Sequence, residues 1–246
     1  MSFYSSIVKA YDEIFPLNKV QAQFIEGMFP VLLGKKVLDC GCGTGSLAIE
    51  LGRRSAGVDA FDLDATMVSK AKDKRPQAID VRFSENDLLR FGDDYATDSF
   101  DLVYCLGNTL AHLPSLNEVA AYVNAASKLL KEGGTVLMQV VNYDWVVKNK
   151  ISHLPTINSD NYEFERNYIP ESHGVIQFST ILTDKNTNES FTQAIPLIPI
   201  LKNDLAKILS DQFTEIQFFG SLKKEDWSEE SFHTVVVAKK RTRQSV

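Results

Sequence analysis

The sequence predicts an α/β protein built on a seven-stranded, mostly parallel sheet with helices on both faces, plus an antiparallel β insertion after the fifth strand. Two features of the chain lead to this prediction. Between residues 35 and 141, short apolar runs typical of buried strands alternate with longer segments of helical period. After residue 150, strand-like segments follow one another without intervening helices. Strands joined by helices pair in parallel, whereas strands joined by short turns pair antiparallel.

The first two strands each lead directly into a helix. The run Lys36–Cys40 (KVLDC) ends in a glycine-rich turn, and the segment SLAIELGRR that follows has helical period. Gly57–Leu63 repeats the strand pattern, and the next segment, ATMVSKAKDK, places Met67 and Ala71 on one helical face. Two strand-turn-helix units of this length predict neighbouring parallel strands.

Three further strands complete the parallel part of the sheet. They are expected at residues 81–83, Phe100–Leu106 and Thr135–Val141. The helix before the last of them is expected to start at a capping box formed by Ser115 and Glu118, and to end at Gly133 and Gly134.

The remaining chain carries the insertion and closes the sheet. Strands of the insertion are expected at Tyr162–Tyr168, Val175–Thr183 and Ser190–Ile195. The turn TDKNTN between the last two predicts a hairpin, and we interpret the whole segment as an excursion from the main sheet. A helix at Leu201–Leu209 then precedes the two last strands, Glu215–Phe219 and Phe232–Ala238.

The composition restricts the functions that the chain can have. A hydrophobic fraction of 44% and a charged fraction of 24% are ordinary for a globular protein. A net charge of −6 provides no long-range attraction for nucleic acid or anionic lipid. No apolar run is long enough to span a membrane, no secretory signal pattern is present, and three cysteines cannot all pair. We therefore expect a cytoplasmic protein that binds neither nucleic acid nor membranes; the oligomeric state cannot be inferred.

The turn after the first strand is the strongest candidate for a ligand site. It reads Asp39-Cys40-Gly41-Cys42-Gly43-Thr44-Gly45, at the sheet edge where ligands of α/β proteins bind. Three alternating glycines permit positive φ and let a ligand lie against bare backbone. The spacing is not that of a dinucleotide-binding loop, because Ser46 stands where its third glycine is needed, and no Lys-Ser/Thr pair follows as in a nucleotide-triphosphate loop.

The stretch VLDCGCGTG resembles motif I of class I S-adenosylmethionine-dependent methyltransferases, which have a Rossmann-like sheet, and the resemblance continues through most of the chain. It implies that Asp62 binds the ribose hydroxyls, with Asp59 and Asp64 as rivals, and that Asp87 accepts from the adenine amino group unless it only caps a turn. Tyr11 resembles an N-terminal lid tyrosine. The remaining residues that the resemblance assigns to the cofactor are Asp39, Gly41, Cys42, Gly43, Gly45, Leu63, Met67, Leu88 and Cys105.

The resemblance also suggests a division of one domain, residues 1–246, into four parts. They are an N-terminal helical lid (1–33), a cofactor-binding core (34–150), an antiparallel acceptor-side insertion (151–200) and a C-terminal helix with the last two strands (201–246).

Two segments, YCLGNTLAHLPS and VVNYDWV, are similar to stretches of glycine and sarcosine N-methyltransferases. The resemblance implies a small-molecule acceptor that is an amine, although Val141 stands where the group often has an arginine for the acceptor carboxylate. We expect catalytic roles for Asn108, His112 and Tyr143. Further candidates for contact with the acceptor are Asn142, Asp144 and Arg166.

Three other functions stay open at this point. An O-methyltransferase would need a base such as His112. A nicotinamide-dependent oxidoreductase could share the sheet, and a non-catalytic module could keep the cofactor pocket alone. No metal is expected, because His153, His173 and His233 are scattered and no Cys-x-x-Cys or His-x-x-x-His pair occurs.

Overall fold

A seven-stranded sheet forms the centre of the computed structural model, which describes residues 7–171 and 174–242. Its strands are β1 (Lys36–Cys40), β2 (Gly57–Asp62), β3 (Val81–Glu85), β4 (Phe100–Cys105), β5 (Leu130–Val141), β10 (Phe213–Phe219) and β11 (His233–Lys240). The order is β10-β11-β5-β4-β1-β2-β3, with β1 to β5 parallel and β11 antiparallel to both β5 and β10. The strand order reverses between β1 and β4: β2 and β3 are added on one side of β1, and β4 and β5 on the other. Ligands of such sheets bind at this switch point.

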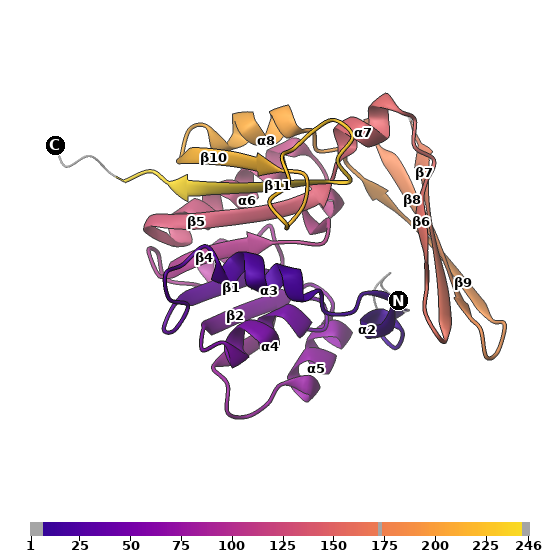
Figure 1. Cartoon of the computed structure of the whole chain (residues 1–246), viewed down its shortest axis with the longest axis horizontal. Helices are drawn as coiled ribbons and strands as arrows, with labels where there is room; N and C mark the ends of the chain where they lie inside the picture. Colours follow the sequence, from indigo (N-terminus) through magenta and orange to yellow (C-terminus); the bar gives the residue numbers. More distant parts are fainter. Residues whose placement is uncertain (1–6, 172–173, 243–246) are drawn as a thin grey trace.

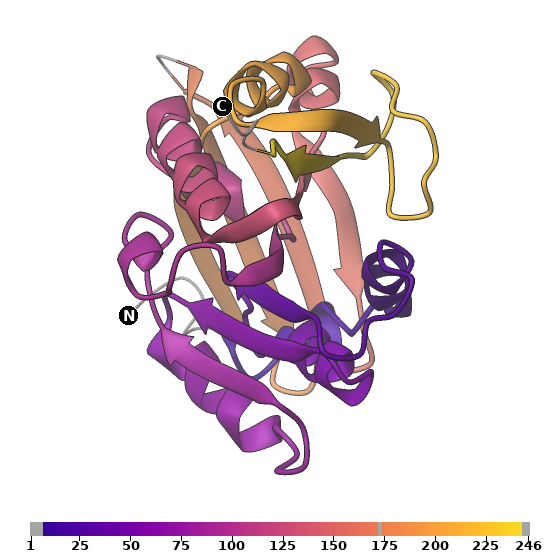
Figure 2. The same cartoon turned by 90° about the vertical axis from the view of Figure 1, so that its left-hand side faces the viewer.

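Helices cover both faces of this sheet (Figures 1 and 2). One face carries α3 (Lys19–Glu26), α4 (Ser46–Arg53) and α5 (Ala65–Lys74); the other carries α6 (Leu116–Leu129) and α8 (Lys202–Leu209). Successive strand residues point to opposite faces, so Val37 packs with the first set and Leu38 with the second, and both are fully buried. A sheet buried on both faces explains why its strands are nearly continuous apolar runs. The predicted fold class is therefore confirmed.

The insertion forms a second sheet of its own. Its strands are β6 (His153–Asn158), β7 (Tyr162–Pro170), β8 (Ile176–Asp184) and β9 (Ser190–Leu197), all antiparallel. The expected antiparallel excursion is confirmed, and its three expected strands are β7, β8 and β9; the fourth strand, β6, was not expected. Only Leu154 of β6 is buried, so this strand lacks the alternating apolar pattern that would reveal it. The second sheet stands across the carboxyl ends of the parallel strands (Figure 1).

The boundary between α6 and β5 differs from the expected one. Ser115 caps α6 as expected, accepting a hydrogen bond from Asn117 N at 3.1 Å, and its hydroxyl also contacts Glu118. The helix ends at Leu129, however, and not at the glycine pair. Gly133 and Gly134 lie inside β5, where the register against β4 shifts. The glycines do not end the helix. They allow the irregular backbone of this strand, in which Gly133 has φ +69°.

The N-terminal segment lies between the two sheets. Its short helix α2 (Tyr11–Ile14) belongs to a third apolar cluster, in which Ile14 packs with Met67 of α5 and with Phe164 of β7. This cluster joins the main sheet, the insertion and the N-terminal segment at one point. No helix among the described residues is long and apolar enough to cross a membrane.

Candidate active site

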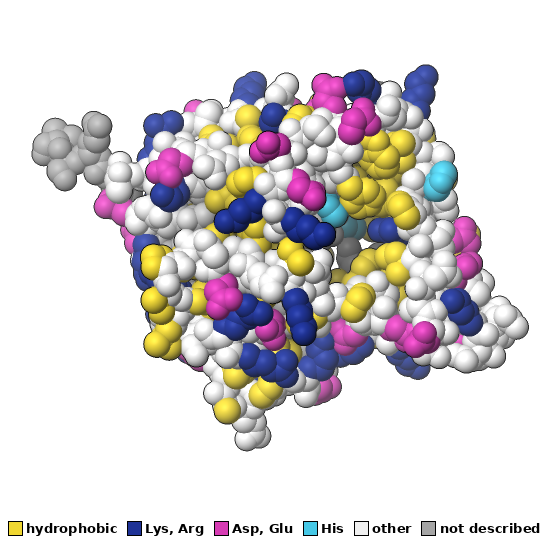
Figure 3. All heavy atoms as spheres, viewed as in Figure 1, with side chains coloured by type: hydrophobic (Ala, Val, Ile, Leu, Met, Phe, Trp, Pro, Cys, Tyr) yellow, Lys and Arg dark blue, Asp and Glu magenta, His cyan; other side chains and the backbone are white. Residues whose placement is uncertain are grey.

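A cavity of about 440 Å³ opens where the two sheets meet. The glycine loop after β1 forms one end of it, the segment after β4 and the end of β5 form the floor, and one face of β7 and β8 forms the opposite wall. Figure 3 shows the hollow between the main body and the insertion, with hydrophobic, basic and histidine side chains at its rim. The cavity thus lies at the switch point of the sheet, as the sequence predicted for a ligand site.

All three glycines of the loop have left-handed backbone conformations, with φ +84° at Gly41, +54° at Gly43 and +75° at Gly45. A Cβ atom at Gly43 would stand 2.9 Å from the Tyr11 hydroxyl, so the tyrosine lies directly against bare backbone. The loop can therefore adopt this shape, and admit a close neighbour, only with glycine at these positions.

Asp62, at the end of β2, holds the glycine loop in place. Its Oδ2 accepts a hydrogen bond from Gly43 N at 2.8 Å, and its Oδ1 accepts one from Asp64 N at 3.0 Å. Burial raises the pKa of the carboxyl, opposed by these two backbone donors. Each carboxylate oxygen has a second lone pair, so both retain the capacity to accept from a ligand. Asp64, one of its rivals in the sequence, instead caps α5 through Thr66 N and Met67 N.

Asp39 is the one carboxylate among the described residues that line the cavity. Its side chain is 4% exposed, and its pKa is raised to about 7 because burial disfavours the charge. The hydroxyl of Tyr104 lowers this pKa and the negative charge of Asp62 raises it further. A cation brought into the cavity would therefore find a carboxyl that ionises readily in its presence.

Five further residues that the resemblance assigned to the cofactor do not line the cavity. Asp87 Oδ1 accepts from Leu89 N at 2.9 Å, so the carboxylate caps the turn after β3, which is the alternative that the sequence left open. Leu63 is 68% exposed, Leu88 packs against the main core, and Met67 and Cys105 are fully buried. Roles for these five side chains stay predictions, because the cavity does not reach them.

On the acceptor side, Asn108 and His112 line the cavity. Asn108 has φ +71° and precedes the short helix η2 (Thr109–His112). Its Oδ1 accepts from Val141 N and its Nδ2 donates to the Tyr143 hydroxyl, both at 3.0 Å. Burial lowers the pKa of His112 to about 4, so its imidazole is neutral at physiological pH.

Three residues predicted on the acceptor side, Asn142, Tyr143 and Asp144, lie outside the cavity lining, and their roles at the acceptor stay predictions. The segment after β5 begins α7 (Tyr143–Lys148), and its polar side chains serve the fold. Asn142 is fully buried and donates to Ser231 O at 2.9 Å, Asp144 Oδ2 accepts from Lys202 N at 2.9 Å, and Tyr143 is fully buried behind Asn108. None of the three lines the cavity. The sequence pattern did not reveal the short helix that turns these side chains away.

The cavity contains polar residues that the sequence did not single out. Gln139 of β5 is 8% exposed, and its Oε1 is buried without a hydrogen-bond partner. His233 of β11 also lines the cavity, and its pKa is lowered to about 4 by burial and by the nearby positive charge of Arg166. Arg166, a candidate from the sequence, lies on the insertion wall. Gln139 and His233 face the same space only because β5 and β11 are paired, which the sequence pattern does not specify.

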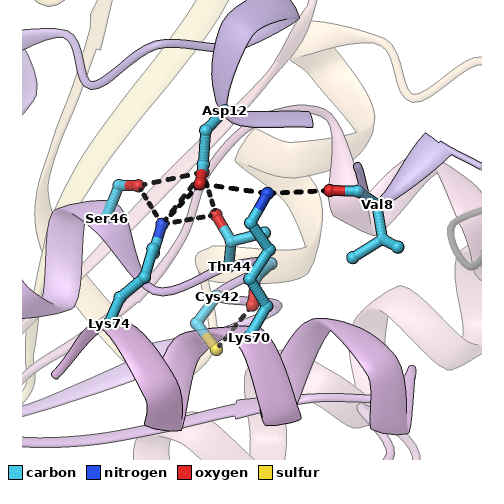
Figure 4. A network of polar contacts seen from close by, with 8 residues as sticks. Val8, Asp12, Cys42, Thr44, Ser46, Lys70 and Lys74 are labelled. Atoms are coloured by element: carbon cyan, nitrogen blue, oxygen red, sulfur yellow. Dashed lines mark hydrogen bonds and ion pairs between the residues drawn. The ribbon is translucent and has the colours of Figure 1, made fainter. Parts of the chain in front are cut away.

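A polar network fastens α2 over the glycine loop (Figure 4). Asp12 accepts two hydrogen bonds from Lys74 Nζ at 2.9 and 3.0 Å, forms an ion pair with Lys70 at 3.3 Å, and also contacts the hydroxyls of Thr44 and Ser46. Burial alone would raise the pKa of Asp12, but the bonds from Thr44 and Lys74 outweigh it and lower the pKa. The network ties the N-terminal segment to both helices beside the loop.

No metal centre is apparent in the part of the chain that the structure describes, since it contains no group of three or more His, Cys, Asp or Glu side chains placed to hold an ion. His153 is outside the cavity lining, and His173 lies outside the described residues.

Sequence comparisons relate the central part of the chain to methyltransferases. Residues 37–134 match the model of the methyltransferase domain. The ubiquinone biosynthesis O-methyltransferase of Paracidovorax citrulli is 32% identical over 128 residues, 51% of each chain, and that of Idiomarina loihiensis is 35% identical over 129 residues, 51% of this chain and 50% of the other. The chain therefore spans about half the length of the curated relatives that it matches.

Structural comparisons extend over nearly the whole chain. An S-adenosylmethionine-dependent methyltransferase from Clostridium acetobutylicum has a TM-score of 0.81 at 18% identity, covering 98% of this chain and 100% of the other. The methyltransferase CcbJ from Streptomyces caelestis has a TM-score of 0.80 at 18% identity, covering 96% of each. CalS10, an amino pentose methyltransferase from Micromonospora echinaspora with S-adenosylmethionine bound, has a TM-score of 0.69 at 18% identity, with 95% and 96% covered. The chain has the Rossmann-like fold of these methyltransferases, insertion included.

Proposed function

We propose that the protein transfers a methyl group from S-adenosylmethionine to a small-molecule acceptor in the cavity between the sheets. The observation that carries this proposal is the glycine loop at the switch point, held by Asp62 through Gly43 and opening into the cavity beside Asp39. The match of residues 37–134 to the methyltransferase domain supports it.

The residues present suit the chemistry of this cofactor. S-adenosylmethionine has a sulfonium, a ribose diol and an amino-acid end with an ammonium and a carboxylate, and it has no phosphate; the ammonium and the diol call for carboxylate acceptors. Asp39 would hold the ammonium end and Asp62 the ribose hydroxyls, with Gly41 and Gly43 giving close backbone approach. The bound cofactor supplies an electrophilic methyl carbon, whose transfer is an in-line displacement. The protein's part is to align the acceptor and exclude water.

We favour an amine acceptor. Gln139 Oε1 is buried without a partner at the cavity wall, so it would accept a hydrogen bond from a donor on the acceptor. A neutral amine is a nucleophile without help from a base, and it would keep one N–H for this bond. The likeness to glycine and sarcosine N-methyltransferases in two segments agrees with an amine, and so does the amino pentose named for CalS10.

Small-molecule O-methylation is the second candidate, favoured by one observation and by the named relatives. His112 lines the cavity as a neutral imidazole, which is the form that can take a proton from a hydroxyl. The curated relatives are named as O-methyltransferases. A nicotinamide cofactor is disfavoured, because Ser46 replaces the third glycine of the dinucleotide loop.

Replacement of His112 by Gln separates these two chemistries. If the acceptor is an amine, we expect the rate of methyl transfer to fall by less than about threefold; loss of a required general base costs about 10²–10⁴-fold. Because the pKa of His112 is about 4, the pH dependence of the wild-type rate should show no ionisation of His112 near pH 6.5, whichever acceptor is used. The measurement is single-turnover methyl transfer to a panel of amines and phenols, with His153→Gln as an exposed control. A loss of a hundredfold or more in His112→Gln would establish O-methylation and contradict the amine.

The Asp12 network also makes a testable contribution to cofactor exchange. Tyr11 lies against Gly43, and Asp62 is the charge that raises the pKa of its hydroxyl most, after burial. Access of a ribose to Asp62 therefore requires α2 to move, and the network opposes that movement. We expect Asp12→Asn to raise both the association and dissociation rates of S-adenosylhomocysteine by about three- to tenfold.

Stopped-flow fluorescence would measure these rates. Asp73→Asn is a matched control, because it makes the same charge change on an exposed position of α5, beside Lys74. Unchanged rates in Asp12→Asn, or equal changes in both variants, would show that α2 does not control entry.

A further inference from the structure

The insertion presents one aromatic face to the cavity, with a single cation in its middle. Phe164, Arg166 and Tyr168 occupy alternate positions of β7 and all line the cavity. Leu154 of β6 pairs with Arg166, Phe178 of β8 pairs with Tyr168, and both line it too. An arginine amid such apolar neighbours is costly unless something compensates its charge.

Nothing in the described part of the chain compensates it fully. Arg166 Nη2 donates to Pro155 O at 2.6 Å, but its Nε is buried without a hydrogen-bond partner. No described carboxylate forms an ion pair with the guanidinium. Asp39, the acidic side chain of the cavity lining, belongs to the glycine loop at the other end. Burial lowers the pKa of Arg166, opposed only by Tyr168, as expected for a cation without a counter-ion.

The charges around Arg166 limit the negative charge of an anion that could bind beside it. The other titratable groups of this wall and floor are Tyr168, His112 and His233, and both imidazoles are neutral at physiological pH because their pKa values are about 4. One guanidinium therefore stands alone. It balances a single negative charge, and its planar fork matches a carboxylate, whereas a phosphate monoester carries nearly two charges at neutral pH.

We infer that the acceptor of the methyl group carries a carboxylate, which binds to Arg166 while its apolar part lies against the aromatic face of β7 and β8. The inference rests on the proposed function in that the acceptor enters this cavity. It assigns Arg166 as the residue that selects acidic acceptors over neutral ones, a substrate class that the names of the compared proteins do not state.

Three ligands of similar shape test the charge that the site selects. Benzoate, neutral benzamide and doubly charged phenyl phosphate are titrated by ligand-observed NMR into protein loaded with S-adenosylhomocysteine. We expect benzoate to bind about ten- to hundredfold more tightly than benzamide and more tightly than phenyl phosphate. Equal binding of benzoate and benzamide, or no binding of benzoate, would overturn the inference. Tighter binding of phenyl phosphate would assign the site to phosphate instead.

Variants test whether Arg166 is responsible. We expect Arg166→Gln to reduce benzoate affinity to that of benzamide, Arg166→Lys to retain part of the preference, and Arg82→Gln, an exposed control on β3, to leave it unchanged. Unchanged benzoate affinity in Arg166→Gln would refute the assignment. A purely structural arginine would instead stabilise the fold, so the melting temperature of Arg166→Gln, which we expect to stay level or rise, separates the two roles.

The order of the measurements separates this inference from the proposed function. Binding of S-adenosylhomocysteine alone is measured first in the wild type and in Arg166→Gln, where we expect equal affinity. Failure of that binding would contradict the proposed function. Normal binding followed by no preference for benzoate would contradict only the role of Arg166. Should Arg166→Gln not fold, the three ligands on the wild-type protein still decide.

Discussion

Replacing Asp62 by Ala is expected to weaken binding of S-adenosylmethionine by a hundredfold or more. The change removes two functions of one carboxylate. The hydrogen bond to Gly43 N at 2.8 Å, which holds the loop, is lost, and so are the lone pairs that would accept from the ribose. Charged hydrogen bonds contribute about 1.5–3 kcal/mol each, so the loss of two accounts for this effect. Isothermal titration calorimetry measures the dissociation constant directly.

Asp59→Ala is the matched control for this experiment. Asp59 lies on the same strand, but its carboxylate faces Arg82, with Oδ1 at 3.5 Å from Nη1, and it does not line the cavity. We expect cofactor affinity within about twofold of the wild type, since exposed ion pairs contribute little. Equal losses in Asp59→Ala and Asp62→Ala would point to general destabilisation of β2. Full affinity in Asp62→Ala would remove the role assigned to this residue.

Replacing Asp39 by Asn is expected to change affinity and stability in opposite directions. The folded protein holds the Asp39 proton up to pH about 7, whereas the unfolded chain releases it near pH 4. Between these values the folded state binds more protons, so stability falls as pH rises, and the loss is complete above pH 7. The full shift corresponds to on the order of 4 kcal/mol, which Asn does not incur. The variant should therefore melt at a higher temperature at pH 8.5 and show little difference at pH 4.

Affinity for the cofactor should rise with pH, whereas stability falls. The ammonium of the cofactor favours ionised Asp39, so wild-type affinity should improve by up to about tenfold per pH unit as pH rises from 5.5 to 7, and the Asn variant should bind about ten- to hundredfold more weakly with a flat profile. Calorimetry at several pH values measures both. Asp101→Asn is a contrasting control: its pKa is lowered, because its bonds with Lys131, Lys36 N and Lys35 outweigh burial, so that substitution should lower stability at pH 8.5. A pH profile in Asp39→Asn like that of the wild type would contradict the account.

Local patterns in the sequence were sufficient for most of the fold. The strands and helices from Lys36 to Lys74 follow from apolar periodicity and the glycine turn, because a buried parallel sheet imposes a continuous apolar pattern on its strands. The pattern failed where burial was slight. In β6 one side chain is buried, and α7 has six residues, too few for a clear helical period.

The residues of the candidate site likewise fall into those that a local sequence pattern predicts and those that it does not. The loop glycines and Asp39 could be found from sequence because a chain motif places them together. Asn142 and Asp144 could not be separated from true cavity residues, since their orientation depends on which backbone groups they cap. No local pattern predicts Gln139, His233 or the network around Asp12, because tertiary packing alone brings these parts of the chain together.

Calorimetric titration of the wild-type protein with S-adenosylmethionine and, separately, with NAD shows whether the cavity beside the glycine loop binds S-adenosylmethionine. We expect binding of one S-adenosylmethionine per chain, weakened by Asp62→Ala and not by Asp59→Ala, and no binding of NAD. Binding of NAD without binding of S-adenosylmethionine would contradict this expectation.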